Sequence, residues 1–237
     1  MSEELVGPLW DTLAMTVADR NRRPAEDLLH RLIKSARHHL GMEVSFISEF
    51  TGNERVLRYV DSVAPISVRV GDSDPLERSY CQRVVDGRLP ELICVAWELP
   101  AALELSVTAA LPIGAHIAVP LILSSGRVYG TFCAFSRRAN RSLTERDLAV
   151  VHMFADIARQ VIEDDLTVAN QYNAALERTR SVLTGEGNLK IVFQPIFKLV
   201  TEELIGVEAL SRFPQDPSRT PDIWFSEAAS VGLGVDL

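Results

Sequence analysis

The stretch from Ser142 to Leu183 contains neither proline nor glycine, and it constrains the fold more than any other part of the chain. A helix of about 40 residues would be roughly 60 Å long at 1.5 Å per residue. Steps of three and four residues alternate between its mostly apolar or small seam positions, which is typical of a coiled coil. These positions are Leu148, Val151, Ala155, Ala158, Ile162, Asp165, Ala169, Tyr172, Leu176, Thr179 and Leu183. Because one small domain cannot cover such a helix, we expect only its first half to pack on a domain.

The second half of this helix admits two interpretations. One is a parallel homodimer through the helix around residues 144–184, in which the small or polar Asp165, Ala169 and Thr179 make a weak, adjustable seam. The other is a single solvated helix that links two domains.

The region before the long helix predicts an antiparallel sheet with flanking helices. "MEVSFISEF" and "RVLRYVDSVA" alternate apolar and polar residues around "TGN", and "AHIAVPLIL" and "VYGTFCAFS" flank "SSGR", so two β-hairpins are expected. Helical periodicity over residues 27–40 ends at Gly41, and a further helix is expected over residues 75–86, ended by Gly87. The pattern indicates an α+β fold.

A second pattern follows the glycine-containing break "LTGEGNL" at residues 183–189. "IVFQPIFKLVTEELIGVEALSRF", residues 191–213, contains two apolar runs around a polar turn and predicts a third hairpin. "DIWFSEAASVGLG" then predicts a helix that ends at Gly232.

Composition argues against several partners. Lys and Arg number 24 and Asp and Glu 32, and the net charge of -8 argues against broad binding to nucleic acid or to anionic membranes. Since no apolar stretch approaches the roughly 20 residues of a membrane span and the N-terminus does not resemble a signal peptide, we expect a cytoplasmic protein. Cys81, Cys94 and Cys133 fit no zinc-binding spacing and are expected to be buried free thiols.

The first part of the chain, roughly residues 24–161, resembles a GAF domain. The resemblance is carried by "IGAHIAVPLILSSGRVYGTFCAFS" and the long helix after it. It implies a small-molecule-sensing domain whose ligand the sequence does not identify, or one that only dimerises. Cys81 lies near the position where some relatives hold a chromophore, but the Cys-His pair of many tetrapyrrole-binding members is missing. His116 is expected either to occupy the core or to ligate haem.

The last part resembles the start of an EAL domain, the cyclic di-GMP phosphodiesterase module. Its matches are "FQPIFKL", "GVEALSRF" and "WFSEAASVGLG", in the order of that family. The resemblance implies the β-hairpin plus helix fragment of a (β/α)8 barrel whose first strand is antiparallel to its neighbour.

The EAL resemblance assigns roles to three residues of the hairpin. It implies that Glu208 binds a divalent cation, Mg²⁺ or Mn²⁺, that Gln194 contacts the dinucleotide and that Arg212 meets a phosphate. It covers only about the first quarter of the module, so the catalytic set is incomplete. The chain as given is expected to be inactive and to need no cofactor.

These observations predict an N-terminal segment (1–23), a GAF domain (24–161), a coiled-coil helix (162–185, continuous from about 144) and a truncated EAL start (186–237). The expected function is the sensory region of a cyclic di-GMP signalling protein whose full-length parent hydrolyses cyclic di-GMP to linear pGpG. Two alternatives remain: a non-catalytic module for small-molecule binding and dimerisation, or a parent whose degenerate EAL domain acts as a cyclic di-GMP receptor.

Overall fold

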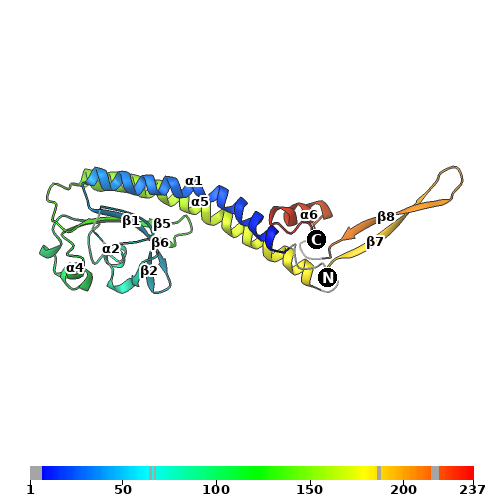
Figure 1. Ribbon diagram of the computed structural model, residues 1–237. Coiled ribbons are helices and arrows are strands. Elements are labelled where there is room, and N and C mark those ends of the chain that lie inside the picture. Colours follow the sequence, from blue (N-terminus) through cyan, green and yellow to red (C-terminus); the bar gives the residue numbers. More distant parts are fainter. Residues whose placement is uncertain (1–6, 64–65, 67, 186–187, 215–218) are drawn as a thin grey trace. The chain divides into compact units, whose positions relative to one another are not determined.

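The computed structural model describes residues 7–63, 66, 68–185, 188–214 and 219–237, with side chains from residue 24 onward (Figure 1). The chain divides into two compact units, which we call the sandwich unit (Arg22–Asp165) and the second unit (Met1–Asn21 with Leu166–Leu237). The helices and strands are α1 Gly7–Leu40, β1 Val44–Thr51, β2 Glu54–Ser62, β3 Ser73–Pro75, η1 Leu76–Arg78, α2 Tyr80–Val85, β4 Leu92–Ile93, η2 Ala96–Glu98, α3 Pro100–Leu103, α4 Ser106–Ala110, β5 Ala115–Ile122, β6 Val128–Ser136, α5 Glu145–Thr184, β7 Lys190–Phe197, β8 Leu204–Arg212 and α6 Pro221–Ser230.

The sandwich unit is built on a six-stranded antiparallel sheet in the order β3-β2-β1-β6-β5-β4. Both hairpins expected in this region are confirmed, as β1–β2 and β5–β6. Gly52 and Gly126 sit in their turns at φ values of 62° and 81°, a left-handed conformation that glycine adopts without steric cost. Pairing of β1 with β6 joins the two hairpins into one sheet.

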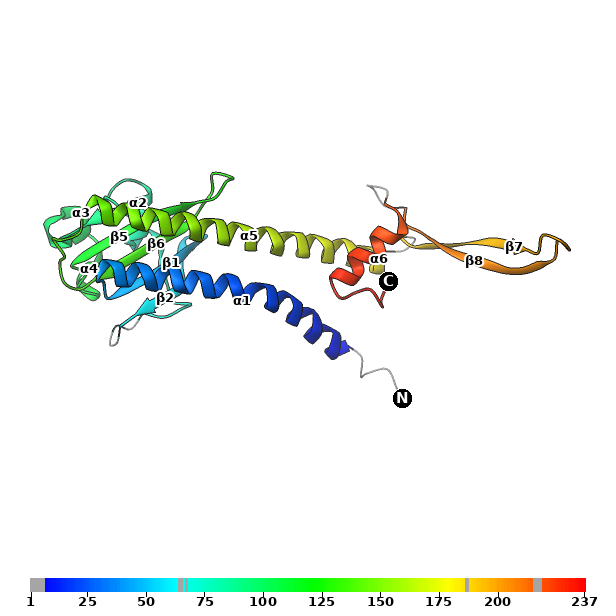
Figure 2. The same ribbon diagram turned by 90° about the horizontal axis from the view of Figure 1, so that it is seen from above.

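Helices cover both faces of this sheet. Within the sandwich unit, α1 and α5 lie side by side over one face, as the two views show (Figures 1 and 2). Helix α2 contacts β5 and β6 and contributes Tyr80, Cys81 and Val84 to a core cluster with strand residues such as Phe46 and Phe135. The two helices over the first face bury the apolar residues Leu29, Leu32, Ile33, Ala36, Leu40, Val151, Ala155, Ala158 and Ile162. The first half of the predicted seam is therefore buried in a domain core, as expected.

Helix α5 confirms the long helix predicted from the chain without glycine and proline. At its start, the backbone N–H and the hydroxyl of Thr144 both donate to Asp147 Oδ2 at 2.8 Å, which caps the first turn. Near the end of the sandwich unit, Glu163 accepts hydrogen bonds from the backbone N–H of Ser124 at 2.9 Å and from Arg159 at 3.0 Å. The β5–β6 turn is thus bonded directly to α5.

Two predicted helix bounds were wrong. Helix α1 begins at Gly7 rather than near residue 27, and Pro24 lies inside it. Most of the expected N-terminal segment is therefore helical, while residues 1–6 lie outside the described residues. The helix expected over residues 75–86 is reduced to α2, because Ser79 has an extended backbone and accepts a hydrogen bond from the Gln82 backbone N–H at 3.1 Å. This N-cap starts the helix after a short strand and a 3₁₀ turn.

The second unit contains the third predicted hairpin, β7–β8, and the predicted helix α6. Val182 near the end of α5, Phe213 and Trp224 of α6 form a small buried cluster, with the two aromatic rings stacked at 5.4 Å between centroids. Glu227 accepts hydrogen bonds from Arg178 of α5 and from Arg219, which fixes α6 to the last turns of α5.

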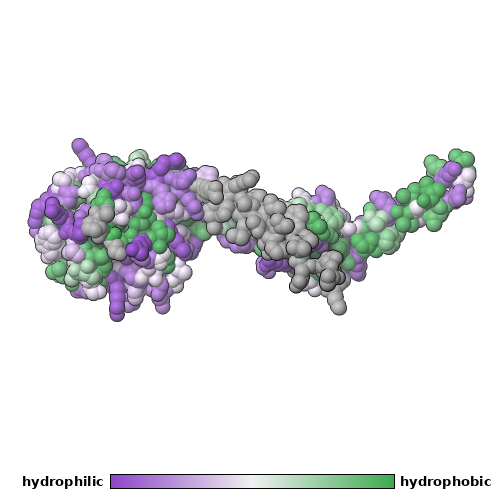
Figure 3. Space-filling view, viewed as in Figure 1, coloured by the Kyte–Doolittle hydropathy of each residue, from purple (hydrophilic) through white to green (hydrophobic). Residues whose placement is uncertain are grey.

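The β7–β8 hairpin exposes hydrophobic side chains along its length, as the green surface shows (Figure 3). Every residue of β7 is exposed. The exposed apolar side chains of the two strands are Ile191, Val192, Phe193, Ile196, Phe197, Leu204, Ile205 and Val207. A two-stranded sheet is marginally stable by itself, so this surface is one that further structure would normally cover. Among the described helices, none has an apolar stretch long enough for a bilayer crossing.

Candidate functional site

A small cavity of about 30 Å³ lies in the sandwich unit, on the core side that includes α2. This volume accommodates a molecule of about the size of water. The cavity is lined by Phe46, Arg55, Leu57, Val68, Tyr80, Val107, Leu111, Ile113, His116 and Phe135. Its wall is apolar except for a few polar groups, the composition typical of a small-molecule site.

Arg55 of β2 is the charged group of the cavity wall. Its side chain is only 13% exposed, and it makes a two-pronged ion pair with Asp74, with Nε to Oδ1 at 2.8 Å and Nη2 to Oδ2 at 3.0 Å. The guanidinium also lies 5.5 Å from the centre of the Phe46 ring. Burial by itself lowers the pKa of Arg55. The neighbouring Cys81 and Asp74 raise this pKa by a larger amount, so the net shift is upward and the guanidinium stays charged.

His116 of β5 is a buried polar group with an unsatisfied ring nitrogen among the described residues. It is 2% exposed, and its Nδ1 has no hydrogen-bond partner among the residues that the structure describes. Burial, and secondly the positive charge of Arg55, lower the pKa of His116 to about 3. His116 is thus a core residue, as one of the two sequence interpretations predicted, and it is neutral at pH 7. A ligand in the cavity would find an unpaired ring nitrogen there.

Tyr80 covers the cavity from α2. Its ring lies 4.7 Å from that of His116, and its hydroxyl is 2.7 Å from the hydroxyl of Thr108 in α4. Thr108 in turn donates to the backbone carbonyl of Ala102 in α3. One hydrogen-bonded chain therefore holds α2, α3 and α4 together above the sheet.

The thiols are free, as predicted, and two of the three are fully buried. Cys81 and Cys133 are buried, whereas Cys94 is half-buried. Cys81 is in contact with Arg55, whose Nη1 donates a hydrogen bond to Cys81 Sγ at 3.3 Å.

The sequence alone did not indicate Arg55 and Tyr80 as site residues. The signal for Arg55 was its position two residues before the buried Leu57, which places a charge on the core-facing side of β2.

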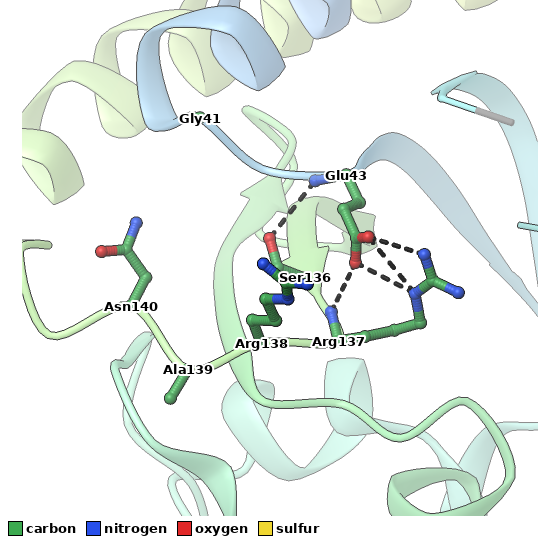
Figure 4. Close-up of a pocket in the computed structure, with 7 residues that line it drawn as sticks. All are labelled: Gly41, Glu43, Ser136, Arg137, Arg138, Ala139 and Asn140. Atoms are coloured by element: carbon green, nitrogen blue, oxygen red, sulfur yellow. Dashed lines mark hydrogen bonds and ion pairs between the residues drawn. The ribbon is translucent and has the colours of Figure 1, made fainter.

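A separate open groove lies beside the end of α1 (Figure 4). It is lined by Gly41, Glu43, Ser136, Arg137, Arg138, Ala139 and Asn140. The carboxylate of Glu43 accepts from the Arg137 backbone N–H and from its guanidinium Nη2, both at 2.7 Å. Hydrogen bonds from the Arg137 side chain lower the pKa of Glu43. Because the main carboxylate here is already paired, the groove is a weaker candidate than the cavity.

The structure places the three residues of the EAL resemblance on one hairpin of the second unit, β7–β8. Gln194 of β7 pairs directly with Glu208 of β8, and Arg212 lies four residues further along β8. Since side chains alternate between the two faces of a sheet, all three belong to the same face. Among the described residues, no group of three or more His, Cys, Asp or Glu side chains is placed to hold a metal ion.

Comparison with known proteins places the sandwich unit in a fold family. The chain resembles the GAF domain of PixJ from Thermosynechococcus elongatus in its blue-light-absorbing form, with a TM-score of 0.52, 13% identity, and coverage of 66% of this chain and 94% of that one. It also resembles the phycocyanobilin-bound GAF domain of a cyanobacterial phytochrome (TM-score 0.51, 13% identity, 66% and 94% coverage). A third neighbour is the chromophore-binding domain of the bacteriophytochrome RpBphP3 from R. palustris (TM-score 0.52, 12% identity, 70% and 64% coverage).

At these identities the structural neighbours show the fold alone. No curated protein matches the chain. The sequence model described as GAF domain matches residues 23–163, more than half of the chain and nearly the whole sandwich unit. The chain therefore belongs to the GAF domain family.

Proposed function

We propose that this chain is the sensory and regulatory region of a cyclic di-GMP signalling protein. The GAF domain is the input, α5 carries the signal, and residues 186–237 begin an EAL domain. In the full-length protein that carries the chain, this domain hydrolyses cyclic di-GMP to linear pGpG with Mg²⁺ or Mn²⁺.

The single observation that carries the proposal is the pairing of Gln194 with Glu208 across β7 and β8. It sets an amide, a carboxylate and the guanidinium of Arg212 on one face of a hairpin. Carboxylate oxygens are the ligands that Mg²⁺ prefers, and a guanidinium matches the geometry of a phosphate. These are the groups that binding of a metal-bound dinucleotide requires.

The opposite face of the hairpin supports the same proposal. Phe193 of β7 pairs with Ala209, and Pro195 pairs with Val207, so that face is apolar and exposed. In a barrel, helices cover one side of the strands and the other side is filled or lined by strand residues. The hairpin fits the first two strands of a barrel, with one apolar face and one face on which Gln194, Glu208 and Arg212 lie among Val192, Ile196 and Leu210.

One carboxylate is not enough for the chemistry. A pair of metal ions about 3.5–4 Å apart generates hydroxide and stabilises the leaving oxygen of a phosphodiester. Glu208 would supply one ligand to such a pair, so the proposal requires further carboxylates from elsewhere in the protein.

The test is hydrolysis of cyclic di-GMP by the full-length protein, with and without Mn²⁺ or Mg²⁺. We expect metal-dependent formation of linear pGpG, and a fall to the metal-free level in Glu208→Ala. Glu203→Ala removes a carboxylate from the exposed turn of the same hairpin and serves as the matched control, expected to retain wild-type turnover. Binding of cyclic di-GMP without hydrolysis would replace the proposed enzyme by a receptor. Neither binding nor hydrolysis would leave a GAF module for ligand binding and dimerisation.

The cavity supports the sensory part of the proposal. Its unpaired His116 Nδ1 and the charged Arg55 offer two polar contacts within an apolar wall. A polar molecule of about the size of water is the class of ligand that this space and these groups would accept. This part stands independently of the EAL domain.

We further propose that α5 forms a parallel homodimer around residues 144–184. The seam continues beyond the sandwich unit, where its last residue, Leu183, is 37% exposed. Light scattering is expected to give twice the monomer mass. Leu176→Glu places a charge in the seam and should give the monomer, whereas Asn173→Glu places the same charge at an exposed position and should leave the dimer. A monomeric wild-type protein would refute the dimer.

A further inference from the structure

Two buried thiols lie side by side where α2 packs on β6. Cys81 Sγ and Cys133 Sγ are 3.5 Å apart, and both residues are fully buried. A disulfide bond is about 2.05 Å long, so the sulfur atoms need to approach by only about 1.5 Å to be joined.

The surroundings of the two sulfur atoms are different. Cys81 Sγ accepts a hydrogen bond from Arg55 Nη1 at 3.3 Å, and Asp74 holds that guanidinium in place through two further bonds. Cys133 Sγ instead lies 3.0 Å from the hydroxyl oxygen of Thr131. A neighbouring guanidinium favours the thiolate, so the geometry makes Cys81 the more acidic thiol of the two.

These different surroundings shift the pKa values of the two thiols in opposite directions. Burial raises the pKa of Cys81, but the hydrogen bond from Cys133 and the charge of Arg55 outweigh it and lower the pKa overall. Burial, followed by the interaction with Cys81, raises the pKa of Cys133. Cys81 is therefore the nucleophile of the pair and Cys133 the thiol that keeps its proton.

Access to the pair is restricted to small reagents. Arg55 contacts Cys81 and also lines the cavity of about 30 Å³, so one side chain lies between the cavity and the thiols. A molecule of about the size of water or hydrogen peroxide fits this space, whereas larger disulfides do not.

We propose that hydrogen peroxide oxidises Cys81 and Cys133 to a reversible intrachain disulfide. The Cys81 thiolate attacks one peroxide oxygen, the O–O bond breaks, and Cys81 sulfenic acid and hydroxide form. The sulfur of Cys133 then attacks Cys81 Sγ, the S–O bond breaks, and the Cys133 proton and the thiol proton first lost by Cys81 convert the two departing oxygens to water. Two thiols are oxidised by two electrons, and one peroxide is reduced to two waters.

The disulfide would also alter the ligand cavity. It removes the negative sulfur beside Arg55, so the guanidinium keeps its ion pair with Asp74 but loses Cys81 as an anionic neighbour. A modification site of this kind goes beyond the proposed binding of a small ligand, because the two thiols form a covalent bond with each other.

Peptide mapping of the reduced, folded chain after treatment with hydrogen peroxide tests the proposal. Free thiols are blocked with an alkylating agent in denaturant, and trypsin is added without reductant. Cleavage after arginine places Cys81 in residues 79–83 and Cys133 in residues 128–137, while Cys94 lies in residues 89–127. We expect peptides 79–83 and 128–137 to be joined, two hydrogens lighter than their sum, and to separate with dithiothreitol.

Variants separate the two roles. Cys133→Ala should stop at a sulfenic acid on Cys81, which dimedone added together with denaturant traps, and Arg55→Gln should slow the cross-link at least tenfold. Cys94→Ala is the matched control and should cross-link at the wild-type rate. Oxidation of Cys94 ahead of Cys81 in the folded protein, or a cross-link that includes Cys94, would overturn the proposal. The wild-type measurement depends on no variant, so a variant that fails to fold leaves the test intact.

Discussion

Gly130→Ala is expected to destabilise the GAF domain by at least about 3 kcal/mol and to lower its melting temperature by about 10 °C. A Cβ atom at this position of β6 would lie 1.9 Å from the carbonyl oxygen of Ser48 and 2.7 Å from its carbonyl carbon. Both atoms belong to the backbone of β1, so no side chain can rotate away. The strands would have to separate at the pairing that joins the two hairpins into one sheet.

Urea unfolding followed by circular dichroism measures this loss. Gly206→Ala in β8 is the matched control, since a Cβ there meets no atom within 4 Å and the residue has no left-handed backbone. We expect the control to differ from wild type by less than about 1 kcal/mol. Equal stability of the two variants would show that β1 and β6 do not approach each other as described.

His116→Phe is expected to remove about 2 kcal/mol of pH dependence from the stability of the domain. In the unfolded chain the pKa of His116 is about 6.5. In the folded chain burial, with the charge of Arg55, lowers its pKa to about 3. Because the folded pKa is depressed, the stabilisation is fully present above the unfolded value and is lost as the pH falls from 6.5 toward 3.

The measurement is the free energy of unfolding at pH 7.5 and at pH 5.0, taken from urea titrations. Wild type should lose about 2 kcal/mol more than His116→Phe between these two values. Ile117→Val, at the next position of β5, is the control: it should cost about 1 kcal/mol at both pH values and keep the wild-type difference. If His116→Phe also keeps that difference, His116 does not remain neutral in the folded domain.

The main elements of the fold could be predicted from local signals. Alternating apolar residues around "TGN" and "SSGR" predicted β1–β2 and β5–β6, and the stretch from Ser142 to Leu183 predicted α5. The start of α1 could not be predicted, because Pro24 is a strong signal for the first turn of a helix and here lies inside one. Pairing between β1 and β6 is a tertiary contact that no local pattern contains.

The candidate site was less predictable than the fold. Periodicity placed His116 among apolar neighbours on a strand, but only the tertiary structure shows that its Nδ1 lacks a partner among the described residues. Cys81 and Cys133 are 52 residues apart in the chain, so their contact depends on the packing of α2 on the sheet. The acidity of the Cys81 thiol depends on Arg55, which belongs to a third element of the fold, β2.

The hydrogen bonds from Ser124 to Glu163 connect the ligand-facing sheet mechanically to the long helix. They tether the β5–β6 turn to α5 two residues before the sandwich unit ends at Asp165. His116, on the cavity wall, belongs to β5, the strand that leads into this turn. A ligand that displaces β5 would therefore pull on the helix through this tether as well as press on it through the core.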